Sequence, residues 1–143
     1  MIDPKTENLL INKEVNENLE SILKRKAFSN GYIFYGPEGL GKKQTAITFV
    51  NEIFNKYSSN SNIKKKIIDN NHPDFLLIEP TYFLKGNLIN RSEAEPSKNN
   101  KGTIRIEQIR NLKTFLGQKS IESGGKIVLI DDAHLLNEAA SNC

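Results

Sequence analysis

The chain has 143 residues, 37% hydrophobic and 26% charged, with a formal net charge of +3 at pH 7. This length is that of one domain and is sufficient to bury a hydrophobic core. The net charge is too small to indicate a nucleic-acid-binding surface. No apolar run is long enough for a membrane span, no secretory signal is visible, and the single cysteine, Cys143, excludes a disulfide framework and a multi-cysteine zinc site within these residues. We therefore expect a cytoplasmic protein with no zinc and no membrane partner.

The first part of the chain predicts a helix, a strand and a second helix. Residues 15–27 carry one apolar stripe at helical spacing, with Asn12 as the N-cap. The aromatic and β-branched run 32–35 ends at Gly36 and is typical of a buried strand. A second helix is predicted from Lys42.

The rest of the chain alternates strands and helices again. Residues 55–71 predict a connection with at most a short helix, and residues 75–78 predict a strand. Residues 84–102 show no periodicity and are interpreted as an exposed insertion.

The last predicted elements are a helix, a strand and the start of another helix. Residues 106–116 predict a helix that Gly117 ends, and residues 126–130 predict an apolar strand. Residues 135–141 resemble the beginning of a helix, and we expect the chain to be a piece of a longer protein. The fold class predicted is α/β, with a parallel sheet flanked by helices.

A phosphate-binding loop is the strongest signal in the sequence. Residues 36–43 match G-x-x-x-x-G-K between a predicted strand and a predicted helix, the context that this motif requires. Its glycines allow backbone N–H groups to point at phosphate oxygens, and Lys42 would reach the β and γ phosphates. An ordinary strand-to-helix turn is the alternative. The predicted nucleotide-binding residues are Gly36, Pro37, Glu38, Gly39, Leu40, Gly41, Lys42 and Lys43.

One position of the loop departs from the motif. The residue after the loop lysine should be Ser or Thr, whose hydroxyl ligates Mg²⁺, but here it is Lys43. A lysine offers the metal no lone pair, and its charge at ~4 Å would repel the metal by on the order of 4 kcal/mol. We expect ATP and Mg²⁺ binding to be weakened, or not to lead to turnover.

An acidic strand end completes the pattern. Asp131 follows the apolar strand and would hold Mg²⁺ through water, and Asp132 would orient or deprotonate the attacking water. Asp132 is a methylene shorter than the Glu usual in hydrolytic members of the class, and a catalytic group misplaced by ~1 Å can cost about 100-fold. Alone this pattern is weak, because any strand that leads into a turn can look similar.

These residues resemble the delta-prime subunits of the bacterial DNA polymerase III clamp loader, which are AAA+ modules. The similarity covers residues 29–42, His72-Pro73-Asp74, residues 104–110 and residues 126–142. The second and third segments discriminate the family, because the loop alone occurs in many P-loop proteins. The resemblance implies that residues 1–143 are a partial AAA+ P-loop domain, truncated before the sensor strand and without the lid and collar domains.

The resemblance also implies a function. It is that of a clamp-loader subunit, which helps to load the sliding clamp onto primer-template DNA together with the ATPase and delta subunits. Lys43 and Asp132 favour a non-hydrolysing structural subunit, and residues 55–71 lack the cysteines of the zinc module that many relatives carry. The alternatives are an active ATPase subunit of the same complex and an unrelated P-loop enzyme such as a small kinase.

Overall fold

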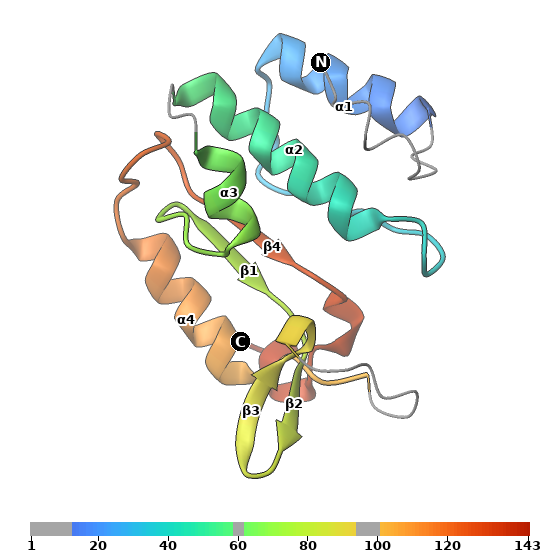
Figure 1. The fold of residues 1–143 in the computed structure, drawn as a ribbon, viewed down its shortest axis with the longest axis vertical. Coiled ribbons are helices and arrows are strands. Elements are labelled where there is room, and N and C mark those ends of the chain that lie inside the picture. The colour runs from blue at the N-terminus through green and yellow to red at the C-terminus, as the bar shows by residue number, and fades with distance from the viewer. Residues whose placement is uncertain (1–12, 59–61, 94–100) are drawn as a thin grey trace. The chain divides into compact units, whose positions relative to one another are not determined.

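The computed structural model describes residues 13–58, 62–93 and 101–143 (Figure 1). They divide into two compact units after Lys64, and each unit is described by itself. The expected N-cap Asn12 lies outside the described residues.

The first unit contains two long helices. Helix α1 spans Lys13–Arg25 and helix α2 spans Lys42–Tyr57, as the apolar spacing predicted. Helix α2 buries several apolar side chains because its apolar positions recur on more than one side. These buried residues are Ala46, Phe49, Val50 and Phe54.

The strand predicted at residues 32–35 is wrong. The segment leads into the phosphate loop but belongs to no strand, and no strand among the described residues pairs with it. Its side chains nevertheless alternate between packed and exposed positions. The rings of Tyr32 and Phe34 pack on Phe49, with centroids 5.3 and 6.5 Å from the Phe49 ring. Ile33 and Tyr35 are 89% and 90% exposed. A strand needs a backbone partner as well as β propensity, so ring packing holds this segment instead.

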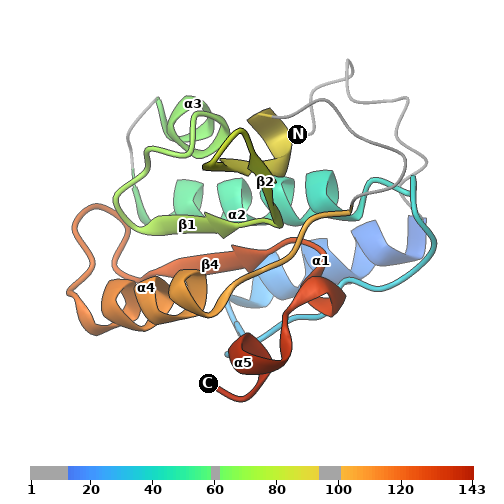
Figure 2. The same ribbon diagram turned by 90° about the horizontal axis from the view of Figure 1, so that it is seen from below.

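The second unit contains a small parallel sheet. Strand β1, Phe75–Ile78, pairs in parallel with β4, Ile127–Ile130, and Phe75 lies opposite Ile127. Helix α4, Ile106–Gly117, and the short α5, Glu138–Ser141, lie on the same side of this sheet (Figure 2). The class is α/β with a small parallel sheet flanked by helices. Strand β4 is half-buried along its length.

The core of this unit lies between one face of the sheet and the two helices. It is formed by Ile78, Ile104, Ile109 and Ala140, against which partly buried residues of the same elements pack. Alternate strand residues such as Leu76 and Ile78 reach this face, as the period of two requires. The short helix α3, Ile63–Ile68, lies in the connection where at most a short helix was predicted.

Residues 84–102 were interpreted as an exposed insertion, and the described part of this segment contains regular structure that the sequence did not predict. Strands β2, Thr81–Leu84, and β3, Asn87–Asn90, form an antiparallel hairpin, followed by the 3₁₀ turn η2, Arg91–Glu93. Its tight turn uses Lys85 and Gly86, both at positive φ, which matches the twist of paired strands. The signal was weak because each strand has four residues and mixes polar with apolar side chains.

The last predicted helix begins later than expected. Residues 133–135 form the 3₁₀ turn η3, which contains the exposed His134, and α5 begins after Asn137. The side chain of Asn137 accepts a hydrogen bond from the backbone N–H of Ala140 at 2.8 Å. An N-cap of this kind places the helix start more firmly than apolar spacing does.

Candidate functional site

The phosphate loop has the backbone of an anion-binding turn. Three of its glycines have positive φ: 144° at Gly36, 83° at Gly39 and 71° at Gly41, the last being the N-cap of α2. Side chains with a Cβ are strained in this region, so the loop depends on glycine at these positions. Residues 36–40 are exposed. The arrangement can offer backbone N–H groups and the start of a sixteen-residue helix to a phosphate group.

Lys42 is folded onto its own loop. Its Nζ donates to the carbonyl oxygen of Gly36 at 2.9 Å and to that of Pro37 at 2.7 Å. An ammonium group has three N–H donors, so one remains for a phosphate oxygen while the other two hold the loop closed. Lys42 therefore bridges the two ends of the loop.

The residues beside Lys42 do not suit a Mg²⁺ ion. Lys43 stands where the motif needs a hydroxyl, and the nearest hydroxyl after it belongs to Thr45. Thr45 is buried, and its hydroxyl donates to the carbonyl oxygen of Gly41 at 3.0 Å, within the first turn of α2. That bond holds the hydroxyl on the helix backbone. The loop thus fits phosphate, but its donor set does not fit the metal that normally accompanies ATP.

A cleft of about 310 Å³ lies within the first unit, beside the loop. Apolar side chains of α1 and of residues 32–35 line most of it, and Lys42 and Thr45 line its end at the loop. The cleft has few polar groups that could orient a ligand.

The acidic strand end lies in the second unit, at the carboxyl end of β4. The backbone N–H of Asp131 donates to the carbonyl oxygen of Ile78 at 2.8 Å, which continues the strand pairing by one residue. Asp132 then turns into the left-handed region, with φ 51° and ψ 51°, and begins η3. Asp and Asn tolerate this backbone better than Glu, which gives a structural reason for the shorter acid here.

The side chain of Asp132 has a partner of opposite charge. Its Oδ2 forms an ion pair and hydrogen bond with Nη1 of Arg91, the first residue after the β2–β3 hairpin. Both side chains are partly buried, 38% exposed for Arg91 and 26% for Asp132. A carboxylate neutralised by a guanidinium is a poor base for an attacking water. Sequence reasoning missed Arg91, because no motif or spacing in the sequence connects it with Asp132.

The predicted site residues therefore fall into two groups. Residues 36–43 belong to the first unit, and Asp131 and Asp132 belong to the second. Each group is locally arranged as described above, and the joint use of the two groups in one nucleotide site stays a prediction.

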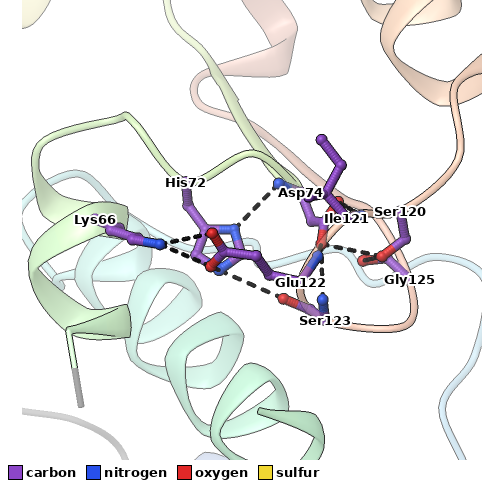
Figure 3. A network of polar contacts seen from close by, with 8 residues as sticks. All are labelled: Lys66, His72, Asp74, Ser120, Ile121, Glu122, Ser123 and Gly125. Atoms are coloured by element: carbon purple, nitrogen blue, oxygen red, sulfur yellow. Dashed lines mark hydrogen bonds and ion pairs between the residues drawn. The ribbon is translucent and has the colours of Figure 1, made fainter. Parts of the chain in front are cut away.

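His72-Pro73-Asp74, noticed in the sequence only as a motif, forms the centre of a polar network (Figure 3). The buried carboxylate of Asp74 accepts hydrogen bonds from the backbone N–H groups of residues 121, 122 and 123 at 2.7, 2.7 and 2.8 Å, and from the hydroxyl of Ser120 at 3.0 Å. Burial by itself raises the pKa of this carboxyl, but the four donors overcome that effect and lower the pKa to about 2. Asp74 thus holds the loop that leads into β4.

His72 closes the same network from the other side. Its Nδ1 accepts a hydrogen bond from the backbone N–H of Asp74 at 3.1 Å, so Nε2 carries the proton of the neutral ring and faces Ser123 Oγ at 3.4 Å. Burial lowers the pKa of His72, and the charges of Glu122 and Asp74 oppose this shift. Beside the ring, Lys66 forms an ion pair with Glu122 at 2.7 Å.

Comparison with known proteins decides the family. A family model described as "DNA polymerase III, delta subunit" matches residues 11–143. The chain belongs to this family. DNA polymerase III subunit delta' of Pseudomonas aeruginosa is 26% identical over 124 residues, which are 82% of this chain and 33% of that protein. No solved structure matches the chain.

Membership of the DNA polymerase III delta family confirms the resemblance that the sequence motifs indicated. The chain spans about a third of the length of the curated relative that it matches. Among the helices that the structure describes, none is long and apolar enough to cross a membrane.

The third family segment, residues 104–110, also has a structural role. Ile104 is fully buried, and its backbone N–H and carbonyl groups bond residues 135 and 137 at 2.9 and 3.1 Å. Gln108 accepts from the backbone N–H of Arg105 and donates to the carbonyl oxygen of Glu79, both at 2.9 Å. This segment therefore ties the start of α4 to the residue after β1 and to the connection between η3 and α5.

Proposed function

We propose that residues 1–143 are a partial AAA+ P-loop domain of a clamp-loader subunit that acts in DNA replication. Membership of the DNA polymerase III delta family supports the clamp-loader role. The phosphate loop with its three positive-φ glycines, and with Lys43 in place of a hydroxyl, supports a degenerate ATP site. In this proposal the full-length protein is cytoplasmic and joins the ATPase and delta subunits, and through them the sliding clamp and primer-template DNA.

The proposed subunit does not hydrolyse ATP itself. One observation carries this: no hydroxyl follows the loop lysine, because Lys43 takes that place and the Thr45 hydroxyl is bonded to Gly41. Without a protein ligand on the loop, Mg²⁺ would be held poorly against the β and γ phosphates, and the charge of the transferred phosphoryl group would not be neutralised. The subunit would then hold the assembly and complete the ATP site of a neighbour.

An active ATPase of the same complex is the second candidate. The intact loop geometry and the seated Lys42 favour it, because both are what phosphate binding requires. Family membership speaks against the third reading, an unrelated P-loop enzyme.

Hydrolysis measurements on the full-length protein separate the two candidates. We would measure Mg²⁺-dependent ATP hydrolysis by the protein alone and mixed with its clamp-loader ATPase partner. The proposal expects no turnover alone and stimulation of the partner that survives Lys42→Ala. Turnover by the protein alone that Lys42→Ala abolishes would replace the proposal with the active ATPase.

A binding measurement adds a separate test of the loop. A fluorescent ATP analogue, titrated without and with Mg²⁺, should bind the wild type with little dependence on the metal. Lys42→Ala should weaken that binding, because the ammonium group is the side-chain cation of the loop. Lys56→Ala, on the last turn of α2, is the matched control.

A further inference from the structure

The carboxyl ends of β1 and β4 are covered by a part of the chain that the sequence did not mark as functional. Figure 1 shows the β2–β3 hairpin and the turn after it beside these strand ends. The covering segment is residues 80–93, here called the hairpin segment. Its contacts to the rest of the second unit come from both backbone and side chains.

Backbone bonds close the base of the hairpin segment. Thr81 and Thr103 exchange N–H to carbonyl bonds of 3.0 and 3.1 Å, and the backbone N–H of Arg91 donates to the carbonyl oxygen of Pro80 at 3.0 Å. These bonds fix the position of the backbone of residue 91. They place its side chain within reach of Asp132, the second residue after β4, without any contribution from its charge.

A buried acid holds the next residue. Glu79, 4% exposed, accepts hydrogen bonds from the backbone N–H of Ser92 at 2.9 Å and from the hydroxyl of the same residue. The carbonyl group of Glu79 is in turn bonded by Gln108 of α4 at 2.9 Å. The turn η2 is therefore attached to the strand end on both sides of Arg91.

Within this frame the guanidinium of Arg91 meets the carboxylate of Asp132. A guanidinium is a planar, permanently charged donor that matches a carboxylate well. In a P-loop ATPase the acidic strand end works beside a metal ion, but here the loop donor set does not fit that ion. In addition Asp132, the acid expected to act on the attacking water, is already paired with a cation of the chain itself. The two facts are independent, since they lie in different units of the chain.

We infer that Arg91 is the built-in counter-ion of Asp132, and that Asp132 serves to latch the hairpin segment onto the sheet instead of orienting an attacking water. The inference deepens the proposed non-hydrolysing function. It is tested separately from it, because the latch is read from the hairpin segment and hydrolysis is read from the nucleotide.

Hydrogen exchange of the full-length protein tests the latch. The variants are Arg91→Gln, Asp132→Asn and the double variant. Asn keeps the left-handed backbone of residue 132 acceptable, and Gln keeps the backbone bonds of residue 91. We expect each single variant to speed exchange at residues 81–90 roughly two- to fivefold, the scale of a partly exposed ion pair. The double variant should exchange no faster than either single one, since both remove the same interaction.

Two controls complete the experiment. Arg110→Gln removes an exposed arginine from α4 of the same unit and should leave exchange at residues 81–90 unchanged. Adding Mn²⁺ alone to the wild type should also leave it unchanged, because Asp132 is already paired. Additive effects of the two substitutions, unchanged exchange in either single variant, or faster exchange on adding Mn²⁺ would each overturn the inference.

Discussion

The carboxylate of Asp74 and the backbone N–H of Ser123 are joined by a hydrogen bond of 2.8 Å across 49 residues of sequence. Asp74 immediately precedes β1, and the loop of Ser123 leads into β4. The same junction continues in the sheet, where the backbone N–H of Ile127 donates to the carbonyl oxygen of Asp74 at 2.9 Å. A single acid thus ties the start of β1 to the loop that leads into β4.

Asp74→Asn should loosen the loop before β4. An amide presents N–H donors where the loop already supplies donors, so the charge-assisted bonds are lost and a buried group is left mismatched. We expect a loss of about 3 kcal/mol in the free energy of local opening. Hydrogen exchange at the amides of residues 121–123 measures it. Asp69→Asn, at an exposed acid, is the control, and equal protection in the two variants would contradict the assigned role.

Acid should release the same loop. The pKa of Asp74 is about 2 in the folded protein against an ordinary value of 3.8, so the stabilisation is complete above about pH 4 and is lost as the pH falls toward 2. The expected loss is about 2 kcal/mol. Protection at residues 121–123 followed from pH 5 to pH 2 should show this fall in the wild type. A similar fall in Asp74→Asn would show that other groups cause it.

His72 should make the network sensitive to mild acid. Its folded pKa lies below the ordinary value of 6.5, so the unfolded state binds more protons in the window below pH 6.5. Stability is therefore complete above about pH 6.5 and declines as the pH falls through it, by at most about 1.4 kcal/mol per pH unit for one proton. His72→Gln should remove this slope.

The tautomer of His72 provides a check that does not depend on stability. At neutral pH the ¹⁵N spectrum of the full-length protein should show His72 protonated at Nε2, since Nδ1 accepts from Asp74. The signal is assigned by its absence in His72→Gln. A ring protonated at Nδ1 would be incompatible with the hydrogen bond described.

Lys43→Thr should restore a hydroxyl at the motif position without creating an efficient ATPase. Asp132 remains a methylene shorter than Glu and remains paired with Arg91, and a misplacement of ~1 Å can cost about 100-fold. Mg²⁺-dependent hydrolysis by the full-length variant measures this. Turnover comparable to that of an ATPase subunit would mean that Lys43 alone suppresses activity in the wild type.

Gly102→Ala should destabilise the base of the hairpin segment. Gly102 has φ 75°, and a Cβ there would lie 3.0 Å from the Cβ of Pro80 and 3.2 Å from the carbonyl oxygen of Thr81. Backbone strain and crowding together should cost about 1–3 kcal/mol. Exchange at the Thr81 and Thr103 amides measures it. Gly117→Ala, where a Cβ meets nothing within 4 Å, is the control and should be neutral.

Local pattern was sufficient for much of the fold. Helices α1, α2 and α4 and strands β1 and β4 lie where apolar periodicity predicted them, because each has a run long enough or apolar enough to show its period. The hairpin β2–β3 was missed because its four-residue strands are held by each other and by Thr103. The strand at residues 32–35 was wrong for the opposite reason, since its composition suits a strand but no described strand pairs with it.

What the sequence alone determined is the chemistry available to this protein: a phosphate loop with Lys42, no hydroxyl at residue 43, and acids at the end of an apolar strand. Those features depend on residue type and short spacing. Only the tertiary structure decided where the side chains are committed, with Lys42 on its own loop, Asp132 on Arg91 and Asp74 on the loop of residues 120–123. Asp132 and Arg91 are 41 residues apart, and a partner chosen by folding across that distance leaves no periodic mark in the sequence.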